Sequence, residues 1–302
     1  GVGSAGLVEL PSRDGEPQPV GMTVQADGSL LAADLREGLF SVTAAVSRIL
    51  PGGTLDPSFG AGGTTAPVVI GTGSQDPAAI AVLTRPADGT VTVAGGDGNG
   101  NLQLVRWTAS GALDAGYGSG GKALIDAAPI SLYPNDAAID AAGRILVFAD
   151  KYPSGPLGAV ARVTPSGALD AGFGTGGIVT TQPAGSTASR VDGGLITAGQ
   201  DIFYVGTSAF VAAPTQRTTI WKVTSGGASS AVASAAVSVR PATPLLVGST
   251  VIAAGDSGAI RSVGFATAGL GLTVNATTTI ASRTIADPIA DLQRLRADGV
   301  GH

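Results

Sequence analysis

The chain has 302 residues, a formal net charge of −5, 47 glycines and no cysteine. The lack of cysteine excludes disulfides, thiolate chemistry and cysteine-based zinc sites. Charged residues are 13% of the chain, about half the usual share. The sequence has no cluster of Lys and Arg residues of the kind that binds nucleic acid or anionic membranes. No apolar run reaches the roughly 18 residues of a membrane-spanning helix, so a soluble all-β globular protein is predicted.

The amino-terminal segment has the layout of a segment far along the chain. Residues 1–7 are GVGSAGL, and residues 172–178 are GFGTGGI, a passage that leads into a predicted strand. The chain is therefore expected to begin inside a repeat, with residues 1–17 supplying the closing strand of the last repeat unit.

Short apolar runs that follow a turn signal recur five times along the chain. Each run is four to five residues long, and a second apolar stretch precedes it across a turn such as Asp-Gly. The five copies span residues 28–34, 89–95, 143–149, 200–206 and 249–255. This pattern predicts one β-hairpin in each of five units.

A longer motif follows the first three hairpins. Arginines 58 and 56 residues apart open the segments RILPGGTLDPSFGAGG (48–63), RWTASGALDAGYGSGG (106–121) and RVTPSGALDAGFGTGG (162–177). A period in this range indicates a repeat architecture. In the second repeat we predict four strands, at residues 79–84, 90–94, 103–108 and 122–126, the first of them rich in alanine.

Four antiparallel strands per repeat, with no long amphipathic helix between them, are typical of a propeller blade. We predict a single β-propeller over residues 1–302, closed by strands from both termini. Five blades are preferred, at 18–75, 76–130, 131–188, 189–239 and 240–302. Six is the alternative, because residues 259–280 also fit a third and fourth strand. Residues 287–299 fit either a third strand or a short helix.

The pattern Arg-x-x-x-x-Gly-x-Leu-Asp-x-x-Phe-Gly-x-x-Gly resembles the signature of the bacterial delta-60-repeat β-propeller family. The second copy differs by Tyr117 in place of Phe, and the fourth copy, near Lys222, lacks the Leu-Asp and Phe-Gly parts. The resemblance covers residues 18–180 well and the rest weakly. It implies a propeller on a secreted or cell-surface bacterial protein, and it implies no defined activity.

The repeated side chains allow structural and functional interpretations. We expect the aspartates to form Asx turns, and calcium ligation is the alternative. We expect the aromatic rings to pack as wedges between blades, and stacking on sugars is the alternative. The arginines fit bonds to carbonyls or to the aspartate of a neighbouring turn, with anion binding as the alternative. These positions are Arg48, Asp56, Phe59, Arg106, Asp114, Tyr117, Arg162, Asp170 and Phe173.

The sequence contains few residues of the types that usually carry out catalysis. The only histidine is His302, which makes triads and histidine-ligated metal improbable, and the Gly-x-Gly-x-x-Gly matches lack the strand and helix of a dinucleotide site. Carboxylate chemistry of the glycosidase type is what remains. Its candidate residues, which are also the candidate binding residues, are Asp34, Asp76, Asp136, Asp150 and Asp256.

The sequence favours a non-enzymatic role. We expect a structural or adhesive interaction scaffold, exported or on the cell surface, that needs no cofactor and no metal. Its expected partners are other proteins or surface glycans rather than nucleic acid or membrane lipid. The alternative is a lectin-like propeller that binds glycans or small molecules, and a carboxylate-based glycoside hydrolase is less favoured.

Overall fold

The computed structural model describes residues 10, 16–37, 41–72, 78–152, 156–197, 199–211, 216–235, 245–247, 250–253, 261–268, 271–274 and 278–279. The chain divides into two compact units, residues 1–147 with 162–170 and residues 148–161 with 171–302. All regular elements in the described residues are β-strands. A helix long and apolar enough to cross a membrane does not occur among them.

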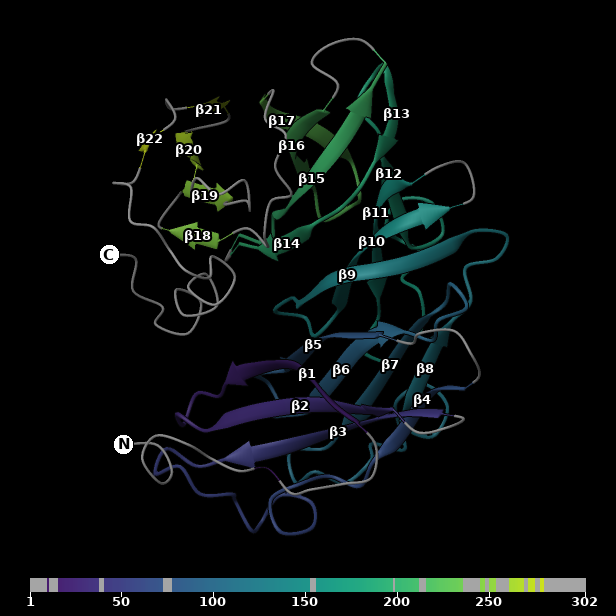
Figure 1. Ribbon diagram of the computed structural model, residues 1–302, viewed down its shortest axis with the longest axis vertical. Helices are drawn as coiled ribbons and strands as arrows, with labels where there is room; N and C mark the ends of the chain where they lie inside the picture. Colours follow the sequence, from purple (N-terminus) through teal and green to yellow (C-terminus); the bar gives the residue numbers. More distant parts are fainter. Residues whose placement is uncertain are drawn as a thin grey trace. The chain divides into compact units, whose positions relative to one another are not determined.

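The first sheet has four antiparallel strands in chain order, β1 (Glu16–Val24), β2 (Leu30–Glu37), β3 (Ser41–Ile49) and β4 (Val68–Thr72) (Figure 1). The β1–β2 hairpin closes over Asp27 and Gly28, where Gly28 takes a φ of 81° and the Asp27 carboxylate accepts the Ser29 N–H at 2.9 Å. This is the hairpin predicted from the Asp-Gly turn signal.

The second sheet repeats this order with β5 (Ala78–Thr84), β6 (Val91–Gly96), β7 (Leu102–Trp107) and β8 (Lys122–Ile125). These bounds confirm, within one or two residues, the four strands predicted for the second repeat. The alanine-rich first strand predicted for this repeat is confirmed in β5, AAIAVLT, whereas β1, the first strand of the first sheet, has the sequence EPQPVGMTV and no alanine. Strand β1 also begins within the segment expected to close the last blade.

Three further antiparallel sheets follow along the chain. The third contains β9 (Ser131–Ile139), β10 (Ile145–Tyr152), β11 (Leu157–Val163) and β12 (Ile178–Thr181). The fourth contains β13 (Ser186–Ser189), β14 (Gly193–Ile196), β15 (Ile202–Phe210), β16 (Gln216–Val223) and β17 (Ser229–Ala235), with β13 and β14 both paired to β15. The fifth contains β18 (Leu245–Val247), β19 (Thr250–Ala253), β20 (Arg261–Ala268), β21 (Gly271–Val274) and β22 (Thr278–Thr279).

The all-β architecture of antiparallel sheets built on four strands is therefore as predicted. The expected boundary between the third and fourth repeats, at residues 188 and 189, falls inside β13. The closing segment before residue 16 and the segment 287–299, predicted as strand or helix, lie outside the described residues apart from residue 10.

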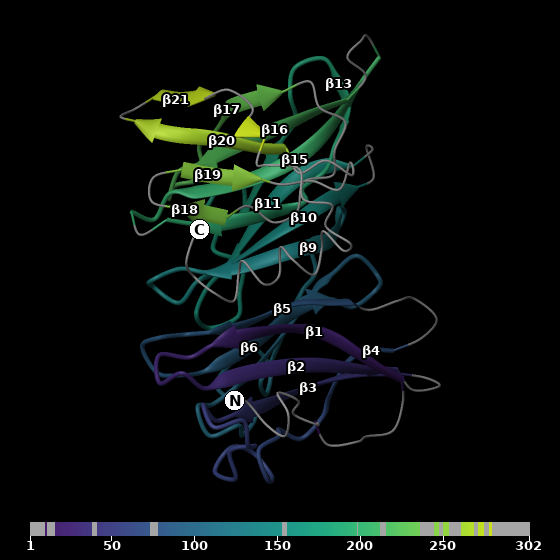
Figure 2. The same cartoon turned by 60° about the vertical axis from the view of Figure 1, so that its left-hand side comes forward.

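Apolar side chains from the first and second sheets share one core cluster in the first unit. Phe59, Val91 and Trp107 are almost fully buried in it, together with residues of β2, β3 and β6. The first strands of these sheets, β1 and β5, run side by side (Figures 1 and 2). Sheet-on-sheet packing of this kind is what alternating apolar strands require, because each sheet must cover an apolar face of its neighbour.

Candidate functional site

The arginine and aspartate of each signature form an ion pair within their own repeat. The Nε atom of Arg48 donates to Oδ2 of Asp56 at 2.7 Å, and Arg106 donates in the same way to Asp114 at 2.7 Å. In the third copy Arg162 donates to Asp170 at 2.8 Å. The aspartate N–H also donates to the arginine carbonyl in all three copies. The seven residues between the partners are thereby closed into a hydrogen-bonded loop.

The second oxygen of the signature aspartate binds the turn that follows it. Oδ1 of Asp56 accepts the Ser58 N–H at 2.9 Å and the Ser58 hydroxyl at 2.7 Å, and Oδ1 of Asp114 accepts the Gly116 N–H at 3.1 Å. These are the bonds of the predicted Asx turn. The hydrogen bonds from Ser58, followed by the charge of Arg48, hold the pKa of Asp56 below its ordinary value.

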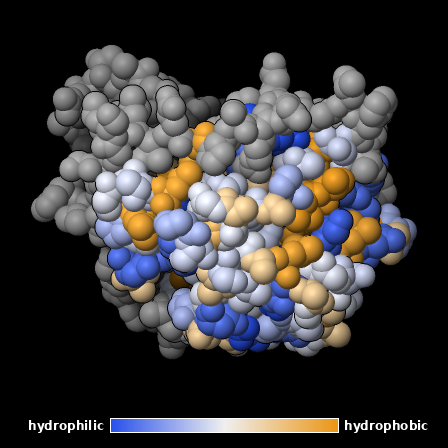
Figure 3. Space-filling view, turned by 90° about the horizontal axis from the view of Figure 1, so that it is seen from below, coloured by the Kyte–Doolittle hydropathy of each residue, from blue (hydrophilic) through white to orange (hydrophobic). Residues whose placement is uncertain are grey.

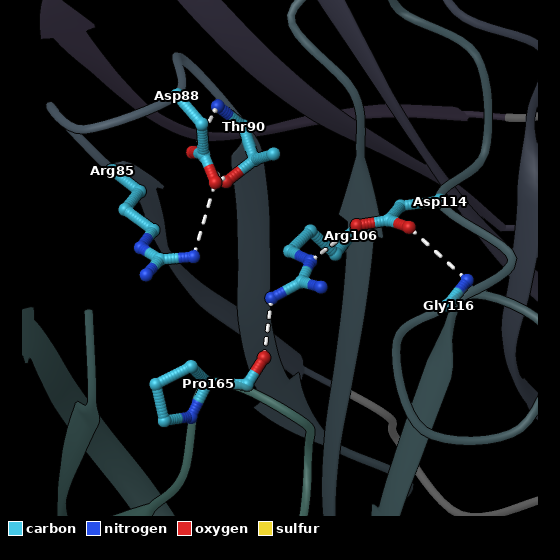
Figure 4. A network of polar contacts seen from close by, with 7 residues as sticks. All are labelled: Arg85, Asp88, Thr90, Arg106, Asp114, Gly116 and Pro165. Carbon is cyan, nitrogen blue, oxygen red and sulfur yellow. Dashed lines mark hydrogen bonds and ion pairs between the residues drawn. The ribbon is translucent and has the colours of Figure 1, made fainter.

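The same arginines also reach the next repeat. Nη1 of Arg48 donates to the Ala109 carbonyl at 2.9 Å, and Nη1 of Arg106 donates to the Pro165 carbonyl at 2.6 Å (Figure 4). The expectation that each arginine binds a carbonyl is confirmed for these two, and the carbonyl belongs to the following repeat. The aspartate that each one binds belongs to its own turn, so the expected aspartate of a neighbouring turn was wrong. Planarity lets one guanidinium serve both partners.

The aromatic residue of the signature lies under the guanidinium. The guanidinium carbon of Arg48 is 4.7 Å from the centre of the Phe59 ring, and that of Arg106 is 4.2 Å from the Tyr117 ring. Both rings and that of Phe173 are fully buried, and Phe59 belongs to the core cluster between the first two sheets. Phe59 therefore acts as the predicted wedge, with cation–π attraction added to burial.

The glycine after each aromatic residue completes the connection between repeats. Its N–H donates to a carbonyl in the third-strand turn of the following repeat, from Gly60 to Ser110 at 2.7 Å and from Gly118 to Ser166 at 2.9 Å. We call these four residues the repeat clasp: Arg48, Asp56, Phe59 and Gly60 in the first repeat, and Arg106, Asp114, Tyr117 and Gly118 in the second. The repeated polar chemistry thus joins one repeat to the next. Gly118 takes a φ of 54°, which identifies its Gly-x-Gly-x-x-Gly match as turn structure.

Three of the five carboxylates proposed as catalytic or binding residues lie within the described residues, and all three are buried and accept hydrogen bonds from the protein itself. Asp34 on β2 is 6% exposed and accepts the Arg36 Nε at 3.0 Å. Asp136 on β9 accepts the Ala137 N–H at 2.9 Å, and Asp150 on β10 accepts the Val191 N–H at 2.9 Å. Within the described residues no three acidic or histidine side chains gather as metal ligands would. Asp76 and Asp256 lie outside the described residues.

A buried carboxylate that sequence analysis missed lies in the loop between β6 and β7. Asp97 is 9% exposed, and its Oδ1 accepts the N–H groups of Asn99 at 2.8 Å and Asn101 at 3.1 Å. Its Oδ2 accepts the Asn101 side-chain amide at 2.7 Å. Burial raises the pKa of Asp97, but these amide bonds outweigh it and leave the pKa below the ordinary value. The alternation Asp-x-Asn-x-Asn was the available signal in the sequence.

A second missed carboxylate lies in the β9–β10 hairpin. Asp140 is 5% exposed and accepts the N–H groups of Ala142 at 3.0 Å and Arg144 at 2.8 Å through Oδ1. Its Oδ2 accepts the Arg144 Nε at 2.6 Å. Like the signature aspartates, Asp140 uses its oxygens to fix a turn, which explains how a buried charge is tolerated there.

No family model and no curated protein sequence matches the chain. Solved structures that are similar to it include an ulvan lyase of family PL25 (TM-score 0.48, 10% identity, 83% of this chain and 64% of that chain). Another is a polysaccharide lyase (TM-score 0.40, 11% identity, 82% and 55%). A third is virginiamycin B lyase from Staphylococcus aureus (TM-score 0.32, 11% identity, 78% and 91%). The chain thus spans less than two thirds of both polysaccharide lyases, and likenesses this distant assign it no function.

Proposed function

We propose that the chain is a non-enzymatic interaction scaffold, a structural or adhesive β-propeller module of an exported or cell-surface protein. The single observation behind this proposal is the use made of the repeated polar residues. In the clasps of the first two repeats, arginine, aspartate and the glycine N–H all bind the protein, and each clasp crosses to the next repeat. The polar residues that recur in these repeats therefore hold neighbouring repeats together.

The segments that differ between repeats are the loops, and these are what a scaffold would offer to partners. The connections between the second and third strands are GLF (38–40), DGNGN (97–101), PSG (153–155) and VAAPT (211–215). They are three or five residues long, only DGNGN contains a charged residue, and all four differ in sequence. On the face seen in Figure 3, apolar residues lie in separate areas among hydrophilic ones. Variable, weakly charged loops on a repeated framework suit protein or glycan contacts rather than electrostatic steering.

Glycan or small-molecule binding is the second candidate function. The observation that favours it is the burial of Asp34, Asp97 and Asp136, each at most 9% exposed. Carboxylates with little exposure to solvent are common in binding sites. Carboxylate-based glycoside hydrolysis would use the same residues and is the least favoured candidate. All of these carboxylates already accept hydrogen bonds from the protein, which is the reason for preferring the scaffold.

A glycan array combined with a turnover assay separates these functions. We expect the wild-type chain to give no micromolar binding to poly- or oligosaccharides and no release of sugar fragments. The informative variant is Asp136→Asn, and Asp126→Asn is its control because Asp126 is exposed. Micromolar binding or sugar release that Asp136→Asn removes and Asp126→Asn retains would replace the scaffold proposal with the glycan one.

A further inference from the structure

The loop between β6 and β7 contains the one Asn-Gly pair of the chain, Asn99-Gly100, and lies within the first compact unit. Asparagine is a thermolabile residue, because the backbone nitrogen of the following residue can attack its side-chain carbonyl carbon. Glycine favours this attack, since it has no Cβ to block the approach. Whether Asn99 can react in the folded protein depends on its exposure and on the hydrogen bonds around it.

Asn99 is exposed, and its amide group is held only loosely. It lies between Gly98 and Gly100, which take φ of 83° and 88°. Its Nδ2 atom is 3.5 Å from both the carbonyl oxygen and Oδ2 of Asp97, beyond the usual length of a hydrogen bond. The Asn101 amide, by contrast, donates to the same Oδ2 at 2.7 Å. Of these two amide groups, that of Asn99 can therefore turn more easily toward the Gly100 nitrogen.

The Gly100 nitrogen is not engaged elsewhere in the loop. Its N–H has no hydrogen-bond acceptor among the described residues. The Asp-Gly pairs in two β-hairpins of the same unit differ in this respect. The Gly28 N–H donates to the Gln25 carbonyl at 3.0 Å, and the Gly89 N–H donates to the Arg85 carbonyl at 2.9 Å. The folded chain thus leaves the attacking nitrogen free at Asn99-Gly100 and occupied in those two hairpins.

We propose that Asn99 is a site of spontaneous deamidation in the folded protein. The Gly100 nitrogen forms a bond to Cγ of Asn99 and loses its proton, and Nδ2 takes up a proton and leaves as ammonia. The product is a succinimide ring. Water then opens the ring, at Cγ to give aspartate or at the main-chain carbonyl carbon to give isoaspartate. The whole reaction consumes one water and releases one ammonia.

The reaction alters a contact between the second and third repeats. The Gly100 carbonyl accepts the Leu132 N–H of β9 at 2.8 Å, and a Cβ added to Gly100 would be 2.5 Å from Cβ of Ser131. Isoaspartate lengthens the main chain by one carbon directly before this closely packed glycine, so the bond to Leu132 is expected to weaken. Both products also add a carboxylate near Asp97, in a loop that differs between repeats.

Ageing of the purified chain near neutral pH, followed by mass spectrometry, tests the proposal. The aged chain is digested with a protease that cleaves before aspartate. The unreacted loop gives the peptide 97–113. Isoaspartate gives the same peptide with OH in place of NH2, whereas aspartate adds a cleavage before position 99. A parallel sample is aged in concentrated urea, where the folded contacts are absent.

We expect Asn99 in the folded chain to deamidate within about tenfold of its rate in urea, because no strong hydrogen bond has to break first. It should also react faster than Asn101 and Asn135 in the same sample. Conversion of Asn99 that is confined to the urea sample, or conversion of Asn135 at an equal rate in the folded chain, would overturn the proposal.

A pair of variants tests the effect on the neighbouring repeat. Asn99→Gln keeps the amide and should remain unconverted, because its longer side chain cannot close the succinimide ring. Asn135→Gln is the matched control and should convert at position 99 like the wild type. Hydrogen exchange of the Leu132 N–H should become faster on ageing in the wild type and the control, and stay constant in Asn99→Gln. Exchange that rises equally in all three chains would refute the link between deamidation and this contact.

Discussion

Replacing Arg106 by methionine tests whether the repeat clasp stabilises the fold. The substitution keeps most of the apolar stem and removes the hydrogen bonds to Asp114 at 2.7 Å and to the Pro165 carbonyl at 2.6 Å. It also removes the guanidinium that lies 4.2 Å from the Tyr117 ring centre. The side chains of Arg106 and Asp114 are only 12% and 20% exposed, so water can replace few of the hydrogen bonds that the substitution removes.

The expected cost follows from these contacts. Each charge-assisted hydrogen bond contributes about 1.5 to 3 kcal/mol net, and a guanidinium over a ring adds about 0.5 to 2 kcal/mol. Partial access of water to Asp114 places the sum at the lower end of the range, at about 3.5 kcal/mol. Arg106→Lys should lose about 2 kcal/mol, because an ammonium cannot reproduce the two-partner fork.

The fourth repeat supplies a matched control. Lys222 occupies the position of the signature arginine there, and its ion pair with Asp201 is 2.7 Å long with side chains 31% and 41% exposed. Lys222→Met should therefore cost no more than about 1 kcal/mol. Urea unfolding followed by fluorescence measures both variants, because Trp107 and Trp221 are buried in different compact units. The experiment is repeated with each tryptophan alone, the other changed to phenylalanine.

The result that would refute this account is a loss below about 1 kcal/mol for Arg106→Met, or a loss equal to that of Lys222→Met. If Arg106→Met does not fold, Asp114→Asn is the milder variant, because it keeps the side-chain volume and removes only the charge that Arg106 binds. It should destabilise the transition seen by Trp107 more than the one seen by Trp221.

Three more predictions concern the same clasps. Tyr117→Phe should raise stability by about 1 kcal/mol in urea unfolding, because the buried Tyr117 hydroxyl has no hydrogen-bond partner among the described residues; unchanged or lower stability would point to a bound water. Gly111→Ala should cost clearly more than Gly62→Ala, since both have positive φ but only Gly111 faces a neighbouring nitrogen at 2.6 Å. The pKa of Asp56 in the folded protein lies below the ordinary value of 3.8, so the ionised carboxylate adds to the free energy of unfolding above pH 3.8 and this stabilisation is lost as the pH falls through the lower folded pKa. Asp56→Asn should therefore weaken the fall of the urea midpoint with decreasing pH on the acid side. An unchanged dependence of the midpoint on pH would contradict this.

Much of the fold could be predicted because its signals are local. Strand positions in the second repeat follow from apolar runs of a few residues bounded by turn glycines. The pairing of Arg48 with Asp56 spans eight residues, a distance that a turn closes by itself. The candidate site was predicted less well. Asp97 and Asp140 were missed although their hydrogen-bond partners lie two and four residues along the chain, because the low exposure of a loop carboxylate is a property of the folded chain and not of its sequence pattern.

The sequence by itself determined the all-β class, the repeat period and the residues of the signature, because hairpins and Asx turns are formed by neighbours along the chain. Only the tertiary structure decided which groups of the next repeat those residues bind. The carbonyl that receives the Arg106 guanidinium belongs to Pro165, 59 residues away, and the need for glycine at position 111 arises from the approach of Gly60. Such contacts depend on how one sheet lies against the next, which no pattern within a single repeat specifies.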